Sequence, residues 1–164
     1  MGFINNLSNK NLGGDNVIQI YTDAAYHPVQ KTAGIGIVID GAQRYQYQYY
    51  LTDVDDNHQA EFAAAIIAMH HLKGIASPIE LIQYQSDSQI VIDSIHKRYA
   101  KKERYERLLE NLLRYIDAYS LFFAKWVSER DNRYADQLAR QALHQAKEGI
   151  PIDQLWLRFD CDQN

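Results

Sequence analysis

The sequence predicts an α/β fold, a five-stranded mixed sheet (three antiparallel strands plus two parallel) flanked by helices. Three observations carry this prediction. Three strand-like runs follow one another after residue 16, joined by short links. The apolar spacing then changes from period two to the helical period. Two further strand-like runs are each bordered by helical stretches, an order that favours parallel pairing.

The first three strands are expected at residues 17–22, 34–39 and 45–51. "VIQIYT" and "GIGIVI" have the density of β-branched residues that is typical of strands. "YQYQYYL" alternates Tyr with Gln, which indicates a half-exposed strand. Because "DG" at 40–41 is a turn signal between the second and third strands, we expect an antiparallel meander.

Helices are expected at about 57–73, 88–99, 103–119 and 132–147, where apolar residues recur at helical spacing. Strands are expected at 78–85 and 121–127. If the first and fourth strands pair in parallel at the middle of the sheet, the functional crevice lies beyond their carboxyl ends.

The sequence divides into a flexible lead-in, residues 1–16, a folded domain, residues 17–148, and a C-terminal tail, residues 149–164, whose place in the fold is left open.

Composition narrows the class of protein. The 164 residues fit one domain, and 46% hydrophobic with 23% charged residues is typical of a soluble globular chain. No apolar run reaches the ~20 residues that span a bilayer, and the first residues hold none of signal-peptide length. We therefore expect a cytoplasmic location and no membrane partner. Cys161 is the only cysteine, which excludes an intrachain disulfide. A net charge of -4 argues against a general nucleic-acid coat protein but leaves a nuclease open.

Four carboxylates stand at selected places. Asp23 and Asp87 follow the first and fourth strands, and Glu61 and Asp136 lie one turn inside helices, at the border of the apolar stripe. Each alone fits a turn, a cap or a helix-dipole charge. Together they could converge, although like charges about 5 Å apart repel by roughly 3 kcal/mol. An all-oxygen site of this kind suits Mg²⁺ or Mn²⁺, and two ions roughly 3.5–4 Å apart could clamp a phosphodiester.

Other charges have local explanations. Glu129 and Asp131 precede the last helix, where acidic residues favour the helix start. The segment "HKRYAKKERYER" (96–107) offers basic side chains for phosphates, and it fits a solvated helix face with Glu–Arg pairs equally well.

Four motifs in order carry a resemblance: "IYTDAAYH…TAGIGIVI", "NHQAEFAAAIIA", "SDSQIVIDSI" and "WVSERDNRYADQLARQAL". Each falls on its expected element, and from about Val17 to about Ala146 the chain resembles the type I ribonuclease H family. The resemblance implies a ribonuclease H-like fold and an endonuclease that cuts the RNA strand of RNA–DNA hybrids with two divalent ions. The four carboxylates look like its metal ligands, with Asp23 bridging both ions, Glu61 and Asp87 completing one site and Asp136 the other.

The same resemblance implies substrate contacts. Asn57 and Gln89 look like the residues that touch bases in the minor groove, which is wide and shallow in a hybrid. Many family members carry a catalytic His in a loop before the last Asp. Here the segment from Val127 to Asp136 is short and has no His, and Arg130, which lies roughly in that place, is expected to contact substrate.

Two further departures concern loops. "AAYHPVQKTA" replaces the Gly-rich loop after the first Asp, and the basic protrusion of some members is much shortened. These departures leave other readings open: a catalytically weak or inactive nucleic-acid-binding module, a same-fold nuclease acting on other RNA, or a structural domain in which the four acids are unrelated. No obligate protein partner is indicated.

Overall fold

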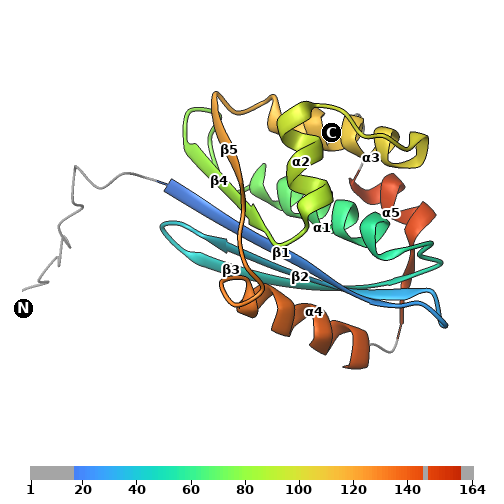
Figure 1. Ribbon diagram of the computed structural model, residues 1–164. Coiled ribbons are helices and arrows are strands. Elements are labelled where there is room, and N and C mark those ends of the chain that lie inside the picture. Colours follow the sequence, from blue (N-terminus) through green and yellow to red (C-terminus); the bar gives the residue numbers. More distant parts are fainter. Residues whose placement is uncertain (1–16, 146–147, 160–164) are drawn as a thin grey trace, which may run out of the picture.

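The computed structural model describes residues 17–145 and 148–159, which form one mixed sheet with helices on both faces (Figure 1). The strand order is β5-β4-β1-β2-β3-β6. The strands are β1 (Val17–His27), β2 (Thr32–Asp40), β3 (Arg44–Thr52), β4 (Leu81–Ser86), β5 (Leu121–Trp126) and β6 (Ile150–Pro151). The helices are α1 (Asn57–Leu72), α2 (Gln89–Lys97), α3 (Glu103–Ile116), α4 (Arg133–Gln145) and α5 (Ile152–Phe159). The predicted lead-in and Cys161 lie outside the described residues.

The fold class and the antiparallel meander are confirmed, with two corrections. The sheet has six strands rather than five, because the two residues of β6 pair in parallel with the end of β3. The first strand does not end at Thr22. It continues to His27, since antiparallel pairing with β2 runs on from Asp23↔Gly36 to His27↔Thr32. The segment after Asp23 is therefore one arm of a tight hairpin and not a loop.

The parallel pairing of β1 with β4 ends at the same point on both strands. The β1–β4 ladder runs from Val17↔Leu81 to Thr22↔Ser86. Asp23 and Asp87 are the next residues on their chains, so both backbones leave the ladder at the same edge. The prediction that these two carboxylates lie beyond neighbouring parallel strands holds, although Asp23 itself remains within β1 through its pairing with β2.

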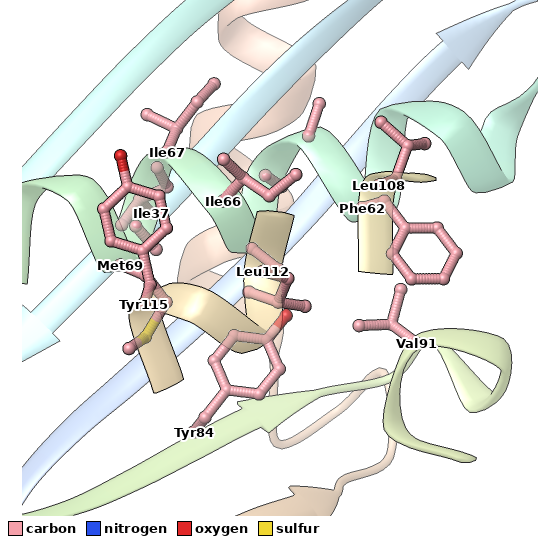
Figure 2. Close-up of a cluster of buried hydrophobic side chains, with 14 of the residues drawn as sticks. Ile37, Phe62, Ile66, Ile67, Met69, Tyr84, Val91, Leu108, Leu112 and Tyr115 are labelled. Atoms are coloured by element: carbon pink, nitrogen blue, oxygen red, sulfur yellow. The ribbon is translucent and has the colours of Figure 1, made fainter. Parts of the chain in front are cut away.

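Helix α1 lies in the middle of the larger layer, between the sheet and α3 (Figure 1). Its residues from Phe62 to Met69 are all buried, so it has no solvent-facing stripe over that length. Figure 2 shows Phe62 and Ile66 of α1 clustered with Tyr84 of β4 and Leu112 of α3. The expected single apolar stripe was wrong in this respect, because the sheet covers one side of α1 and α3 with α5 covers another.

Among the described helices, only α4 covers the opposite face, where it lies against β2 (Figure 1). A Cβ on Gly36 would overlap the carbonyl oxygen of Ala135 and come within 2.6 Å of the backbone nitrogen of Ala139. A Cβ on Gly34 would overlap the carbonyl oxygen of Ala139. Glycine is required at both positions because only a missing side chain permits this approach.

The C-terminal segment joins the core. After β6, helix α5 buries Ile152, Leu155 and Phe159 against the same cluster as α1. Within residues 17–145 and 148–159, no helix has the length and apolar character needed to cross a membrane.

Candidate active site

All four carboxylates singled out from the sequence line one pocket of about 460 Å³. The pocket lies where β1 and β4 leave their parallel ladder, between α1 on one face of the sheet and α4 on the other. Its walls come from Asp23, Ala24, Ala25, Tyr26, Asn57, Glu61, Asp87, Glu129, Asp136, Arg140 and His144.

Asp23 has the most perturbed acidity in the pocket. Burial, the negative charges of Asp87 and Asp136, and a hydrogen bond with Asp136 raise the pKa of its carboxyl, and the net value is about 8. A hydrogen bond from the backbone of Ala24 lowers it in part. Without a cation in the pocket, this cluster therefore holds a proton at neutral pH instead of its full negative charge.

Glu61 of α1 is held by Asn57 and His58 of the same helix and by Ser88, which precedes α2. Asn57 Nδ2 donates to its Oε1 over 3.0 Å, and Ser88 Oγ donates to its Oε2 over 2.6 Å. The Nδ1 of His58 lies 3.2 Å from the same Oε2. Asp56, which precedes α1, caps the helix by accepting from the backbone nitrogen of Gln59. The helix start is thus fixed, and the Glu61 carboxylate with it.

Asp87 is tied to the beginning of α4 through Asn132, a residue that is 1% exposed. Asn132 Nδ2 donates to the carbonyl of Thr22 over 2.8 Å and to Asp87 Oδ1 over 3.3 Å. Its own carbonyl accepts from the backbone nitrogen of Asp136. The side-chain amide of Asn132 therefore links β1 to Asp87, and its backbone carbonyl joins this pair to the start of α4. The sequence analysis does not single out this residue. The sequence feature that could have identified Asn132 is its position directly before a helix, where Asn is a common capping residue.

Asp136 lies in the first turn of α4 and accepts a hydrogen bond from Arg140 Nε over 2.9 Å. Arg140 and His144 follow Asp136 at intervals of four residues, so the three side chains share one side of the helix. Both basic residues line the pocket. In the sequence, the only indication that these three residues act together is their four-residue spacing.

The segment before α4 contains one correction. Glu129, expected to be a local helix-start charge, lines the pocket as a fifth carboxylate. Asp131 is engaged locally, since it accepts from Ser128 Oγ over 3.0 Å. Arg130 is exposed and does not line the pocket, so the structure does not bring it together with the four carboxylates.

Of the two amides expected to contact substrate, only Asn57 is in this pocket. Gln89, the first residue of α2, donates to Asp93 over 2.7 Å and lines a neighbouring groove of about 680 Å³. That groove has a mainly apolar wall and three lysines, Lys97, Lys101 and Lys102. His58 borders it and also contacts Glu61, so the groove begins where the acidic pocket ends.

The chemistry of the donor set fits hard divalent cations. Every acidic group is an oxygen donor, and burial together with the charges of Asp87 and Asp136 raises the pKa of Asp23, an effect that a bound cation would offset. Among the described residues, no three His, Cys, Asp or Glu side chains are grouped as closely as the ligands of a bound metal ion. The carboxylates instead surround the pocket, with Glu61 and Asp136 hydrogen-bonded to protein groups.

Comparisons with known proteins agree with this architecture. The RNase H family model matches residues 15–144. Over 127 residues the chain is 34% identical to EbsB, a protein named as a hydrolase, from Enterococcus faecalis, covering 77% of this chain and 94% of that protein.

Solved structures share the fold. RNase H1 from the halophilic archaeon Halobacterium salinarum superposes with a TM-score of 0.68 and 22% identity, covering 79% of this chain and 99% of that one. LC11-RNase H1 in complex with an RNA/DNA hybrid gives a TM-score of 0.70 and 20% identity, covering 78% and 97%. The family match and the EbsB relationship together show that this chain belongs to the RNase H family and is an RNase H-type hydrolase.

Proposed function

We propose that this chain is an endonuclease that hydrolyses the RNA strand of RNA–DNA hybrids at the pocket bounded by Asp23, Glu61, Asp87 and Asp136, with two Mg²⁺ or Mn²⁺ ions. The observation that carries the proposal is the convergence of these four carboxylates, from four separate elements, on one pocket in which burial and the charges of Asp87 and Asp136 raise the pKa of Asp23. Repulsion among these carboxylates destabilises the fold unless a bound cation offsets it.

The four carboxylates are the residues that would hold the ions. Two such ions supply an activated water and neutralise charge on the attacking and leaving oxygens. Asp23 is central, because its carboxyl lies close enough to both Asp87 and Asp136 for their charges to raise its pKa. Glu129 adds negative charge at the rim of the same pocket.

The surrounding residues fix these ligands in place. Asn57, Ser88 and His58 hold both oxygens of Glu61, and Asn132 orients one oxygen of Asp87. Ligands held by such outer contacts keep their geometry when substrate enters, which is how second-layer groups support metal-dependent catalysis. Arg140, bonded to Asp136, provides a cation that a substrate phosphate can also approach.

The substrate assignment rests on the pocket and on the related fold. LC11-RNase H1, which has this fold, is solved with an RNA/DNA hybrid. In this chain Asn57 reaches the acidic pocket, and Gln89 with three lysines lines the groove beside it. A strand cut in the pocket and a complementary strand in the groove would engage both surfaces, since lysines bind phosphates and amides contact base edges without strong sequence preference.

The test is cleavage of one labelled RNA presented as an RNA–DNA hybrid, as duplex RNA and as a single strand, with Mg²⁺, Mn²⁺ or EDTA. We expect metal-dependent cleavage of the hybrid in preference to the other two. Asp87→Asn is expected to lower the rate by at least about 100-fold, because a direct ligand matters more than the outer contacts that cost 10–100-fold.

Asp153→Asn is the matched control, since Asp153 is exposed on α5, away from this pocket, and should leave the rate unchanged. Cleavage that favours duplex RNA or single strands would replace the hybrid assignment with another RNA substrate. Hybrid binding with no cleavage above the Asp87→Asn background, under either ion, would instead identify a nucleic-acid-binding module.

A further inference from the structure

The acidic pocket has a second, basic end. Asp136, Arg140 and His144 stand at successive four-residue steps on α4, and all three line the pocket. At 1.5 Å per residue, His144 is displaced from Asp136 by about 12 Å along the helix axis. The pocket therefore extends beyond the four carboxylates, along α4, to Arg140 and His144.

The direction of this extension follows from the packing of α4 on β2. Gly36 meets α4 at Ala135 and Ala139, whereas Gly34 meets it one turn later at Ala139 and Leu143. On β1, the partner of Gly36 is Asp23, and the partner of Gly34 is Ala25. Ala24, Ala25 and Tyr26 also line the pocket. The basic end thus lies beyond Asp23 along the hairpin arm of β1, where Ala24 and Ala25 contribute small side chains.

Arg140 and His144 differ in their contacts. Arg140 is bonded to Asp136, so part of its charge already serves the acidic end. The His144 side chain is exposed, and no hydrogen bond or ion pair to it occurs within the part of the chain that the structure describes. A His placed for helix stability alone would favour the C-terminal dipole, but that role does not require it to face the pocket.

We propose that His144 binds a phosphate of the RNA strand close to, but distinct from, the one that is cleaved. The separation of about 12 Å from Asp136 is too large for action on the same phosphorus, whereas a strand lying along the pocket brings its neighbouring phosphates past Arg140 and His144. An imidazole donates to phosphate oxygens, and more strongly when it is protonated. This inference rests on the proposed hybrid substrate, and it assigns His144 to substrate binding and not to the chemical step.

His144→Ala should therefore raise KM for the hybrid by about 3–5-fold, the size of one exposed charged contact, while kcat stays within about twofold. His144→Lys, which retains a donor and a positive charge, should restore KM. Gln145→Ala is the matched control, since Gln145 is the adjacent exposed residue of α4 and lies outside the pocket lining. A rise in KM with Gln145→Ala equal to that with His144→Ala would overturn the proposal.

The phosphate itself can be identified with hybrids in which one RNA phosphate near the cleaved bond is replaced by an uncharged methylphosphonate. One such replacement should raise KM of the wild-type chain by the same 3–5-fold and leave KM of His144→Ala unchanged. If every replacement affects both chains equally, or if His144→Ala lowers kcat at constant KM, His144 does not bind a phosphate.

A binding measurement separates this inference from the proposed function. In the full chain carrying Asp87→Asn, with Mg²⁺, fluorescence anisotropy gives Kd for an uncut hybrid. Adding His144→Ala should raise Kd by about 3–5-fold even if the wild-type chain proves unable to cleave. Cleavage by wild type with an unchanged Kd in this comparison would contradict the role of His144 and leave the nuclease assignment standing.

Discussion

At the scale of single residues, Asp23 determines the electrostatics of the site. Burial and the negative charges of Asp87 and Asp136 raise the pKa of its carboxyl from an ordinary value of 3.8 to about 8. A group whose pKa is higher in the folded state stabilises the fold fully below its unfolded pKa, and this contribution is lost as pH rises through the folded pKa. The metal-free protein should therefore lose stability between about pH 4 and pH 8.

Asp23→Asn tests this directly. In EDTA at about pH 8.5, the variant should be more stable than wild type by about 2–4 kcal/mol, since each pH unit is worth about 1.4 kcal/mol and solvent in the pocket reduces the sum. Thermal unfolding between pH 4 and pH 9 measures the effect. The gain should disappear near pH 4, where the wild-type carboxyl is also neutral. Equal pH dependence in the two proteins would show that Asp23 is not perturbed as described.

Adding Mg²⁺ should reverse the comparison, because a cation offsets the repulsion in wild type and binds the variant less well. Asp23→Asn should be unable to cleave hybrid although it folds more stably in EDTA. A stabilising substitution that abolishes activity is the expected signature of a charge cluster kept for binding a ligand.

Some of the site could be predicted from residues alone and some could not. The strand ends and helix borders indicated Asp23, Glu61, Asp87 and Asp136, because sequence spacing sets their direction on each element. Asn132 could not be recognised as a site residue from the sequence, because the two groups that its side chain contacts lie 45 and 110 residues away along the chain.

Glu129 and His144 depend on the path of the chain around α4. Glu129 lines the pocket from the turn that precedes α4, and His144 does so because α4 packs along β1. Local periodicity does not show that the side chain of Glu129 or of His144 faces the pocket. The segment before Asp136 has no His, which pointed to Arg130, but Arg130 is exposed and outside the pocket. The imidazole that lines the pocket is that of His144 on α4, and His58 of α1 contacts Glu61 from the neighbouring groove.

At the scale of elements, the contact between β2 and α4 sets the position of Asp136. Gly34 and Gly36 leave no side chain between strand and helix, and Ala135 and Ala139 are buried against them. Asp23 is the strand partner of Gly36, so the same contact fixes the separation between Asp23 and Asp136. The geometry of the pocket therefore depends on two glycines that take no part in chemistry.

Gly36→Ala should displace α4, because the added Cβ would overlap the carbonyl oxygen of Ala135. Overpacking of this kind typically costs about 1–3 kcal/mol, and a shift near 1 Å at a catalytic group can lower the rate by about 100-fold. Chemical denaturation and hybrid cleavage would measure the two effects.

Gly74→Ala is the matched control, since a Cβ there would meet only the carbonyl oxygen of His71 at an ordinary 3.7 Å. It should leave both the free energy of unfolding and the rate nearly unchanged. Equal behaviour of the two variants would mean that α4 is not positioned by its contact with β2.

The differences between expected and observed elements have a common cause. "DAAYH" lacks the β-branched residues that mark a strand, yet pairing with β2 extends β1 through it. Helix α1 was placed correctly by its spacing, but its burial on most sides reflects α3 and α5, which local periodicity does not record. Where local propensity was neutral, contacts with other elements determined the length of the strand and the burial of the helix.

At the scale of the whole molecule, the pocket is the place where the two layers meet. Glu61 comes from the layer of α1, Asp136 comes from the layer of α4, and β1 with β4 supplies Asp23 and Asp87 between them. Cations bound there would join all four elements, so metal binding should stabilise the fold and activity should require every ligand.

If these four carboxylates act as one metal-dependent site, Asp136 provides the most direct test, because it is the proposed ligand from the separate layer of α4. The measurement is the single-turnover rate of RNA cleavage in an RNA–DNA hybrid with Mg²⁺, for wild type and Asp136→Asn. We expect cleavage by wild type that EDTA abolishes, and a rate at least about 100-fold lower for Asp136→Asn, which should remain folded. Equal rates for the two proteins, or wild-type cleavage that persists in EDTA, would contradict the account.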